Sequence, residues 1–195
     1  MDIILFFAKF VTKKINKMDE LFPLVNANGA VVGSATRSEC HNGSKLLHPV
    51  VHLHVFNNRG ELLLQKRSMR KDIQPGRWDT SVGGHVDFGE SIETALLREA
   101  QEELGIAGFE FQPLRNYVFE SEIERELVYS YQTVFDGTFT FDPHEIDEIR
   151  FWSLAEIVEA LGKSVFTPNF EDEFQTLFAP PGMLRIHDNR AITEQ

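Results

Sequence analysis

Acidic side chains gather near the middle of the chain, in the segment Arg98-Glu99-Ala100-Gln101-Glu102-Glu103-Leu104-Gly105-Ile106. Positions i, i+3 and i+4 of a helix share a face, so Glu99, Glu102 and Glu103 would lie together. Neighbouring carboxylates repel one another, and a buried carboxylate is costly unless something neutralises it. A divalent cation does so, and hard oxygen ligands suit Mg²⁺ or Mn²⁺. The spacing therefore predicts a metal site on a helix.

The helix that must position these carboxylates is expected over residues 91–104, with Gly105 where a left-handed terminator belongs. One face of it is apolar in its first half and acidic in its second: Ile92, Ala95 and Leu96 share a sector with Glu99 and Glu103. A helix that served only as packing would continue the apolar stripe. The switch from apolar to acidic therefore indicates a functional face.

Extended back to Gly84, the segment resembles the Nudix box, written G-x5-E-x7-R-E-U-x-E-E-x-G-U with U an apolar residue. Every fixed position is met: Gly84, Glu90, Arg98, Glu99, Ala100, Glu102, Glu103, Gly105 and Ile106. The resemblance implies an α/β (α+β) fold in which a mixed β-sheet is sandwiched between α-helices. It also implies a pyrophosphatase that hydrolyses a small diphosphate, typically a nucleoside diphosphate linked to another moiety.

By that resemblance, the three glutamates Glu99, Glu102 and Glu103 would hold Mg²⁺ (or Mn²⁺) against the diphosphate oxygens, where the ion activates a water for in-line attack. Arg98 would fix a glutamate through a charge-assisted hydrogen bond. The structural positions of the motif would be Gly84, Glu90 and Gly105.

The general base is left open, because Nudix enzymes differ in which glutamate removes the proton. Within the box, Glu99 or Glu102 is the preferred candidate. Glu145 or Glu148, in a later loop, is the alternative.

From residue 22 to residue 170 the chain also resembles type 1 isopentenyl-diphosphate isomerase, a relative of the Nudix fold. That family holds a metal with three histidines and two glutamates, and the matching positions here are His41, His48, His85, Glu124 and Glu126. Alternate residues of a strand project to one face, so the two glutamates would act together. Imidazoles with carboxylates suit Mn²⁺ or Zn²⁺ better than Mg²⁺. The resemblance thus implies a second divalent metal site.

One position departs from the isomerase family. Its catalytic cysteine lies two residues before the third histidine, where this chain has Gly83. Glycine cannot transfer a proton to or from an allylic carbon, and the isomerase box is usually degenerate whereas this one is complete. Both differences favour hydrolysis. An isomerase-like enzyme and a non-catalytic ligand sensor are the alternatives.

A basic loop precedes the box in this acidic protein. Its cationic residues are Arg67, Arg70, Lys71 and Arg77. In both resembling families this region lies near the diphosphate, so these side chains are candidates for phosphate binding. The alternative for each is an ordinary solvated charge.

The bulk properties indicate a single domain of 195 residues with a net charge of −11. Such acidity disfavours binding to nucleic acids or anionic membranes and is compatible with a small-molecule diphosphate substrate. Cys40 is the single cysteine, which excludes an internal disulfide and favours a reducing, cytoplasmic location. The oligomeric state is left open, although dimers are common in the family.

We expect three regions along the chain. Residues 1–17 form a leader that is amphipathic or disordered, and its apolar run is too short to span a bilayer. Residues 18–180 form the Nudix domain, and residues 181–195 form a loose tail. Strands are expected over 22–26, 30–33, 48–56, 61–66, 78–82, 117–121, 126–135 and 149–152, with later helices over 154–161 and 170–178.

Overall fold

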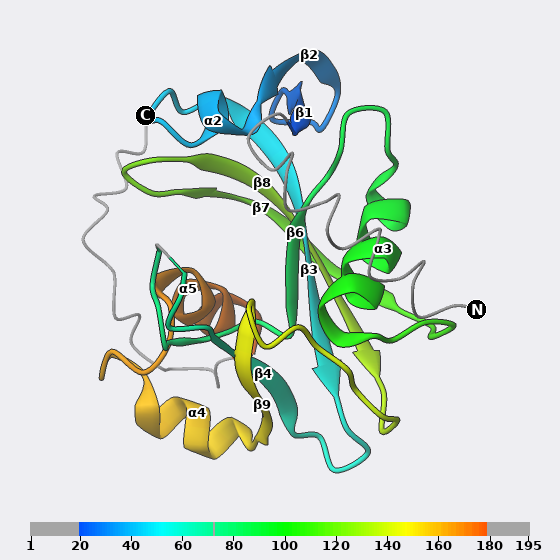
Figure 1. Cartoon of the computed structure of the whole chain (residues 1–195), viewed down its shortest axis with the longest axis vertical. Helices are drawn as coiled ribbons and strands as arrows, with labels where there is room; N and C mark the ends of the chain where they lie inside the picture. The colour runs from blue at the N-terminus through cyan, green and yellow to red at the C-terminus, as the bar shows by residue number, and fades with distance from the viewer. Residues whose placement is uncertain (1–19, 72, 179–195) are drawn as a thin grey trace. The chain divides into compact units, whose positions relative to one another are not determined.

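The computed structural model describes residues 20–71 and 73–178, which form strands and helices in an α+β arrangement (Figure 1). The strands are β1 (Leu21–Val25), β2 (Val31–Thr36), β3 (Leu47–Phe56), β4 (Leu62–Arg67), β5 (Trp78–Asp79), β6 (Val82–His85), β7 (Gln112–Glu120), β8 (Arg125–Val134) and β9 (Ile146–Trp152). The helices are α2 (Arg37–Cys40), α3 (Ile92–Leu104), α4 (Leu154–Ala160) and α5 (Pro168–Leu177).

The described chain divides into two compact units. The first unit contains residues 20–51, 84–95 and 116–129, and the second contains residues 52–83, 96–115 and 130–178. Several elements contribute residues to both units: β3, β6, β7, β8 and α3.

The larger sheet has the strand order β5-β4-β3-β8-β7, with β6 paired to β3 and β9 paired to β4. Strand β4 runs antiparallel to β3, β5 and β9, and Leu63 lies opposite Phe151 in the β4–β9 register. Strands β1 and β2 form a separate antiparallel hairpin.

Within the second unit, β4 lies between helices on both faces. Leu62 and Leu64 are fully buried in an apolar cluster with residues of α4 and α5, such as Ile157 and Phe174. Gln65, on the opposite face because strand side chains alternate, donates a hydrogen bond to Glu103 of α3. The expected sheet between helices is therefore confirmed.

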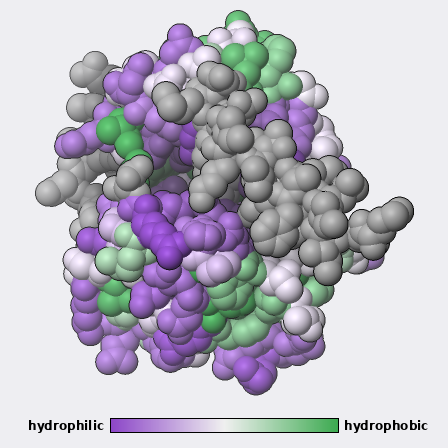
Figure 2. Space-filling view, viewed as in Figure 1, coloured by the Kyte–Doolittle hydropathy of each residue, from purple (hydrophilic) through white to green (hydrophobic). Residues whose placement is uncertain are grey.

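In the first unit, the β1–β2 turn is built from asparagine and glycine as the sequence predicts. The Asn26 side chain accepts hydrogen bonds from the backbone N–H groups of Asn28 and Ala30, at 2.9 and 3.1 Å. Gly29 takes a positive φ of 79°. Hydrophobic residues show at the top of Figure 2, over this hairpin, where Val31 and Val32 are 61% and 66% exposed.

Helix α2 is not among the predicted elements. Its start carries a capping box, in which the Thr36 hydroxyl accepts from the Glu39 N–H and the Glu39 carboxylate accepts from the Thr36 N–H. The helix has four residues and places His41 at its C-terminal cap.

The predicted strand over residues 78–82 is wrong, because the structure has two short strands, β5 and β6, on either side of Thr80 and Ser81. The Ser81 hydroxyl accepts a hydrogen bond from Val55 N–H and donates one to the Leu63 carbonyl. The Ser81 side chain thus makes hydrogen bonds that backbone groups would make in a continuous strand. Strands β7 and β9 also begin earlier than predicted, at Gln112 and Ile146.

The predicted leader (1–17) and tail (181–195) lie outside the described residues. Within the described part of the chain, no helix has the length and apolar character needed to cross a membrane.

Candidate functional site

The acidic part of α3 belongs to the second unit, and its end is fixed by Gly105. This residue has a φ of +68°, as expected for the left-handed terminator of a helix. A β-carbon at Gly105 would lie 1.9 Å from Thr140 Oγ1, so no other residue fits without a shift. On the apolar half of the helix Ala95 and Leu96 are fully buried.

The carboxylate of Glu103 accepts two hydrogen bonds from the second unit. It accepts a hydrogen bond from the Gly83 backbone N–H at 3.1 Å and another from Gln65 Nε2 at 2.9 Å. Burial and, after it, the negative charge of Glu99 raise the pKa of Glu103 to about 7, although both hydrogen bonds act in the opposite direction. A carboxyl group in this state gains from a nearby cation.

Arg98 contacts the other two predicted metal ligands of the box, Glu99 and Glu102. Its Nη1 donates to Glu99 Oε1 at 2.6 Å and lies 3.4 Å from Glu102 Oε2. Glu99 and Glu102 thus share one guanidinium, whereas Glu103 is held by Gly83 and Gln65. Glu90 accepts from the Asp87 N–H, which is a structural contact.

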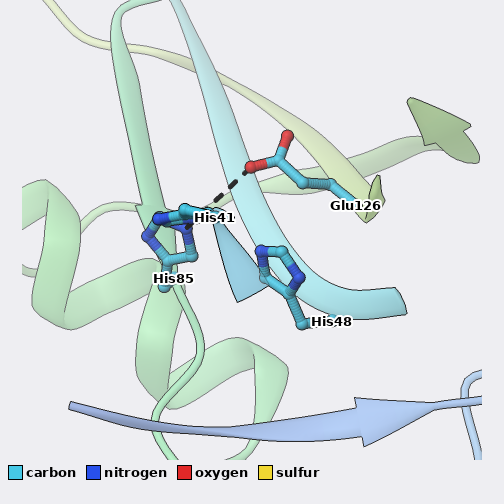
Figure 3. Close-up of side chains that lie close together, drawn as sticks. All are labelled: His41, His48, His85 and Glu126. Carbon is cyan, nitrogen blue, oxygen red and sulfur yellow. Dashed lines mark hydrogen bonds and ion pairs between the residues drawn. The ribbon is translucent and has the colours of Figure 1, made fainter. Parts of the chain in front are cut away.

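A second cluster of possible metal ligands lies within the first unit. The ligand atoms of His41, His48, His85 and Glu126 all lie within 4.8 Å of one another (Figure 3). They come from the end of α2, from β3, from the end of β6 and from β8. Glu124 Oε2 lies 3.4 Å from His41 Nε2. All five residues of the predicted second metal site are thus close together.

Burial favours the uncharged form of two histidines of this cluster, His41 and His48. Burial and, after it, the positive charge of Arg37 lower the pKa of His41 to about 4. Burial also lowers the pKa of His48, against the opposing effect of its hydrogen bond to the Leu46 carbonyl. Neutral imidazole is the form that binds metals.

The orientation of His48 fits a metal ligand. Its Nδ1 donates to the Leu46 carbonyl at 2.9 Å, which leaves a lone pair on Nε2. Nε2 is buried and has no hydrogen-bond partner in the structure. Such an orphaned atom is costly unless something binds it, so the donor set fits a divalent cation that accepts nitrogen and oxygen ligands.

The predicted phosphate-binding residues lie in the second unit, and each has a partner there. Arg67 pairs with Asp79 at 3.2 Å, and Arg77 donates to the Phe166 carbonyl at 3.1 Å. Arg70 contacts His144, and Lys71 pairs with Glu145. Trp78 lies in the apolar core beside Trp152.

One buried polar network was missed by the sequence analysis. Glu173 of α5 is fully buried among His52, His54 and Ser130. The sequence does carry a signal for this network. His52 and His54 are two residues apart on one strand, so their side chains share a face. Glu173 lies between Phe170 and Phe174 on the apolar face of its helix.

Comparison with known proteins gives the family. The NUDIX domain model matches residues 46–173 of this chain. The chain belongs to the Nudix family. An uncharacterized Nudix hydrolase of Yersinia pestis is 33% identical over 150 residues, covering 77% of this chain and 81% of its own length.

Other relatives place the chain in the isopentenyl-diphosphate isomerase-like branch of the Nudix proteins. Isopentenyl-diphosphate Delta-isomerase 2 of Photorhabdus laumondii is 34% identical over 144 residues, covering 73% of this chain and 80% of that protein. A solved Deinococcus radiodurans structure superposes with a TM-score of 0.72 at 26% identity, covering 82% of this chain and all of its own. This Nudix chain is thus a hydrolase by family, and divalent metals are typical of that family.

Proposed function

We propose that this Nudix protein is a metal-dependent pyrophosphatase that hydrolyses a small diphosphate by attack of water on phosphorus. The observation that carries the proposal is the environment of Glu103. Its carboxyl group is held by Gly83 and Gln65 and lies close enough to Glu99 for their charges to repel. Removing that repulsion by a cation is the simplest reason to keep two carboxylates there.

The box residues would divide the work as follows. A bound Mg²⁺ or Mn²⁺, held by Glu99, Glu102 and Glu103, would neutralise the phosphates and make a water more acidic. Glu99 or Glu102 would accept the proton of the attacking water, with Glu145 or Glu148 as the alternative base. Arg98, which contacts both box candidates, would fix their orientation.

A second divalent cation would be held in the first unit by the cluster of His41, His48, His85, Glu124 and Glu126. The buried Nε2 of His48 without a partner supports this assignment. Nitrogen ligands favour Mn²⁺ or Zn²⁺ at this cluster over Mg²⁺.

Phosphate oxygens would be bound from the basic loop. Arg70 and Lys71 are the stronger candidates, because their partners, His144 and Glu145, are side chains that an anion can replace. Arg67 and Arg77 each donate to a backbone carbonyl, which supports a role in shaping the loop. Only their remaining N–H groups would be available to bind phosphate.

An isomerase-like activity on prenyl diphosphates is the second candidate, and the histidine cluster favours it. Gly83 opposes it, since glycine supplies no thiol at the position of the catalytic cysteine. A non-catalytic diphosphate sensor is the third candidate, and the complete box opposes that one.

The test is a panel of diphosphates assayed for phosphate release and for isomerisation, with Mg²⁺, Mn²⁺ and Zn²⁺ each supplied in turn. We expect hydrolysis that falls at least about 100-fold in Glu102→Gln and Glu103→Gln, the scale of losing metal or base chemistry. Glu93→Gln is the matched control, because Glu93 is exposed in the first turn of the same helix. Unchanged turnover in both variants would refute the assignment, and conversion of isopentenyl to dimethylallyl diphosphate would favour the isomerase.

A further inference from the structure

The histidine cluster of the first unit has a cationic neighbour, Arg37, the first residue of α2. One nitrogen of its guanidinium, Nη1, lies 3.1 Å from Glu20 Oε2 and 3.2 Å from Nδ1 of His85. This nitrogen carries two hydrogens, so it can donate to both atoms. The guanidinium also lies over the ring of Phe22, 5.7 Å from the centroid. Arg37 is thus held between a carboxylate and one of the predicted metal ligands.

The contact with Arg37 decides which ring nitrogen of His85 carries a hydrogen. Arginine is always charged and has only donors, so the atom that it contacts must offer a lone pair. A hydrogen on Nδ1 of His85 would instead point at a hydrogen of the guanidinium, with the two nitrogens 3.2 Å apart. The neutral ring must then carry its hydrogen on Nε2.

That hydrogen points at a second ligand of the cluster. Nε2 of His85 lies 3.1 Å from Nε2 of His41 (Figure 3), which is a hydrogen-bond distance. Such a contact needs one hydrogen between the two nitrogens, and His85 supplies it. A proton therefore lies between two atoms that a cation in this cluster would bind.

A bound cation requires the opposite arrangement of hydrogens. His48 already has it, because its Nδ1 donates to the Leu46 carbonyl and leaves the lone pair of Nε2 for a ligand. His85 could bind through Nε2 only after its hydrogen had moved to Nδ1, the atom that Arg37 now occupies. The positive charge of the guanidinium also repels a divalent cation at such short range. Arg37 therefore opposes the cation in two ways.

We propose that Arg37 is a positioning residue that acts through His85 and keeps the cluster in a metal-free arrangement of hydrogens until a cation displaces it. The proposal rests on the second metal site proposed above. On binding, one hydrogen of His85 leaves Nε2 and another is gained at Nδ1 by exchange with water, so the ring stays neutral. The guanidinium leaves His85 and keeps its ion pair with Glu20. Because this rearrangement costs free energy, the cluster binds its cation more weakly than its ligands alone would.

The position of the hydrogen on His85 can be measured in the metal-free protein. Long-range proton–nitrogen NMR spectra distinguish the two neutral forms of a histidine ring, and His85→Gln identifies the signals of this residue. In EDTA at pH 7.5, wild-type His85 should carry its hydrogen on Nε2, and after addition of Zn²⁺ it should carry it on Nδ1. In metal-free Arg37→Met, the Nδ1–H form should become populated.

The second measurement is the affinity for Zn²⁺, by competition with a chromogenic chelator. His48→Gln identifies the part of the signal that belongs to the cluster. Arg37→Met removes the donor and the charge but keeps a long side chain, and should bind Zn²⁺ at least about tenfold more tightly, the scale of effects from residues behind metal ligands. Arg37→Lys keeps the charge and should stay closer to wild type. Arg59→Met is the control for loss of one positive charge, because Arg59 pairs with Glu61 in the second unit, and its affinity should not change.

Two results would overturn the proposal while leaving the metal site intact. One is a metal-free wild type in which His85 carries its hydrogen on Nδ1, a measurement that does not depend on how any Arg37 variant folds. The other is an Arg37→Met protein that is folded by thermal unfolding and binds Zn²⁺ no more tightly than wild type. If neither wild type nor Arg37→Met binds Zn²⁺ at the cluster, the second metal site itself is refuted, and the proposal with it.

Discussion

Phe22 lies flat against the imidazole of His85, with ring centroids 4.4 Å apart and ring planes within 4°. The same phenylalanine stacks on His48 at 5.6 Å, and it is completely buried. Two of the candidate metal ligands are thus held by one apolar side chain from strand β1. The hairpin β1–β2 consequently belongs to the machinery that orients the cluster.

Replacing Phe22 with leucine should weaken metal binding at this cluster. The ligand rings lose their stacking partner, and loss of an orienting contact behind metal ligands typically lowers affinity about 10- to 100-fold. The cavity should also lower the free energy of unfolding by about 1–2 kcal/mol. Competition with a chromogenic chelator for Zn²⁺ measures the affinity. Val25→Ala, a buried change in the same strand, should lower stability while Zn²⁺ affinity stays normal.

Glu103 should make the metal-free protein less stable as pH rises. Its folded-state pKa of about 7 lies above the ordinary value of 4.5, so the folded state binds more protons between these two values. The stabilisation is complete below pH 4.5 and is lost as pH rises to about 7, up to about 3 kcal/mol. In EDTA, urea unfolding at pH 8 should find Glu103→Gln more stable than wild type. The prediction would be contradicted if the free energies of unfolding of Glu103→Gln and the wild type differed by the same amount at every pH in this range.

His41 should keep the metal cluster functional in mild acid. Its folded-state pKa of about 4 lies below the ordinary value of 6.5, so it remains uncharged at pH 5.5. For an ordinary histidine, the uncharged fraction falls to about one tenth at this pH. Mn²⁺ or Zn²⁺ affinity, measured by calorimetry, should therefore fall much less from pH 7.5 to 5.5 than it does for an unstructured peptide with the same ligands.

The same shift has a cost for the metal-free protein. The unfolded chain binds more protons at His41 than the folded one between pH 6.5 and 4, so stability is present above that window and is lost as pH falls through it. His41→Gln should flatten this part of the stability profile in EDTA. If the free energy of unfolding of His41→Gln falls with the same slope between pH 6.5 and 4 as that of the wild type, a group other than His41 causes the loss.

Gly105 and Gly108 form a matched pair for testing the end of α3. Both have a positive φ, of 68° and 66°, but only Gly105 faces an obstacle, Thr140 Oγ1, where its β-carbon would stand. Gly108→Ala should cost about 1 kcal/mol of unfolding free energy for the left-handed backbone. Gly105→Ala should cost about 1–3 kcal/mol more, because atoms must shift to avoid overlap. If urea unfolding shows that both variants lose the same free energy of unfolding, then Thr140 moves away from the new β-carbon at no cost.

Local spacing predicted much of the fold, because the features involved are short-range. The helix that carries Glu99 and Glu103 follows from a periodic pattern and a terminal glycine, and the turn at Asn26 follows from its own hydrogen bonds. Helix α2 could have been predicted as well, since Thr36 and Glu39 show the spacing of a capping box.

Long-range arrangement is what the sequence could not supply. The histidine cluster was expected only through family resemblance, and no periodicity relates His41 to His85. The contact between His52 and Glu173 joins residues 121 positions apart. Spacing also does not reveal the partners of the box glutamates: Arg98 contacts Glu99 and Glu102, whereas Glu103 accepts a hydrogen bond from the Gly83 N–H.

The loop that carries His41 is fastened to the loop that carries Glu124. Gly43 N–H donates to the Ile123 carbonyl at 2.9 Å, and the Lys45 ammonium donates to the Ser121 carbonyl. An imidazole and a carboxylate from distant parts of the chain are thereby coupled mechanically, so opening one loop displaces the other. Hydrogen exchange at the single amide of Gly43 would therefore report when the cluster opens, whether or not a metal is bound.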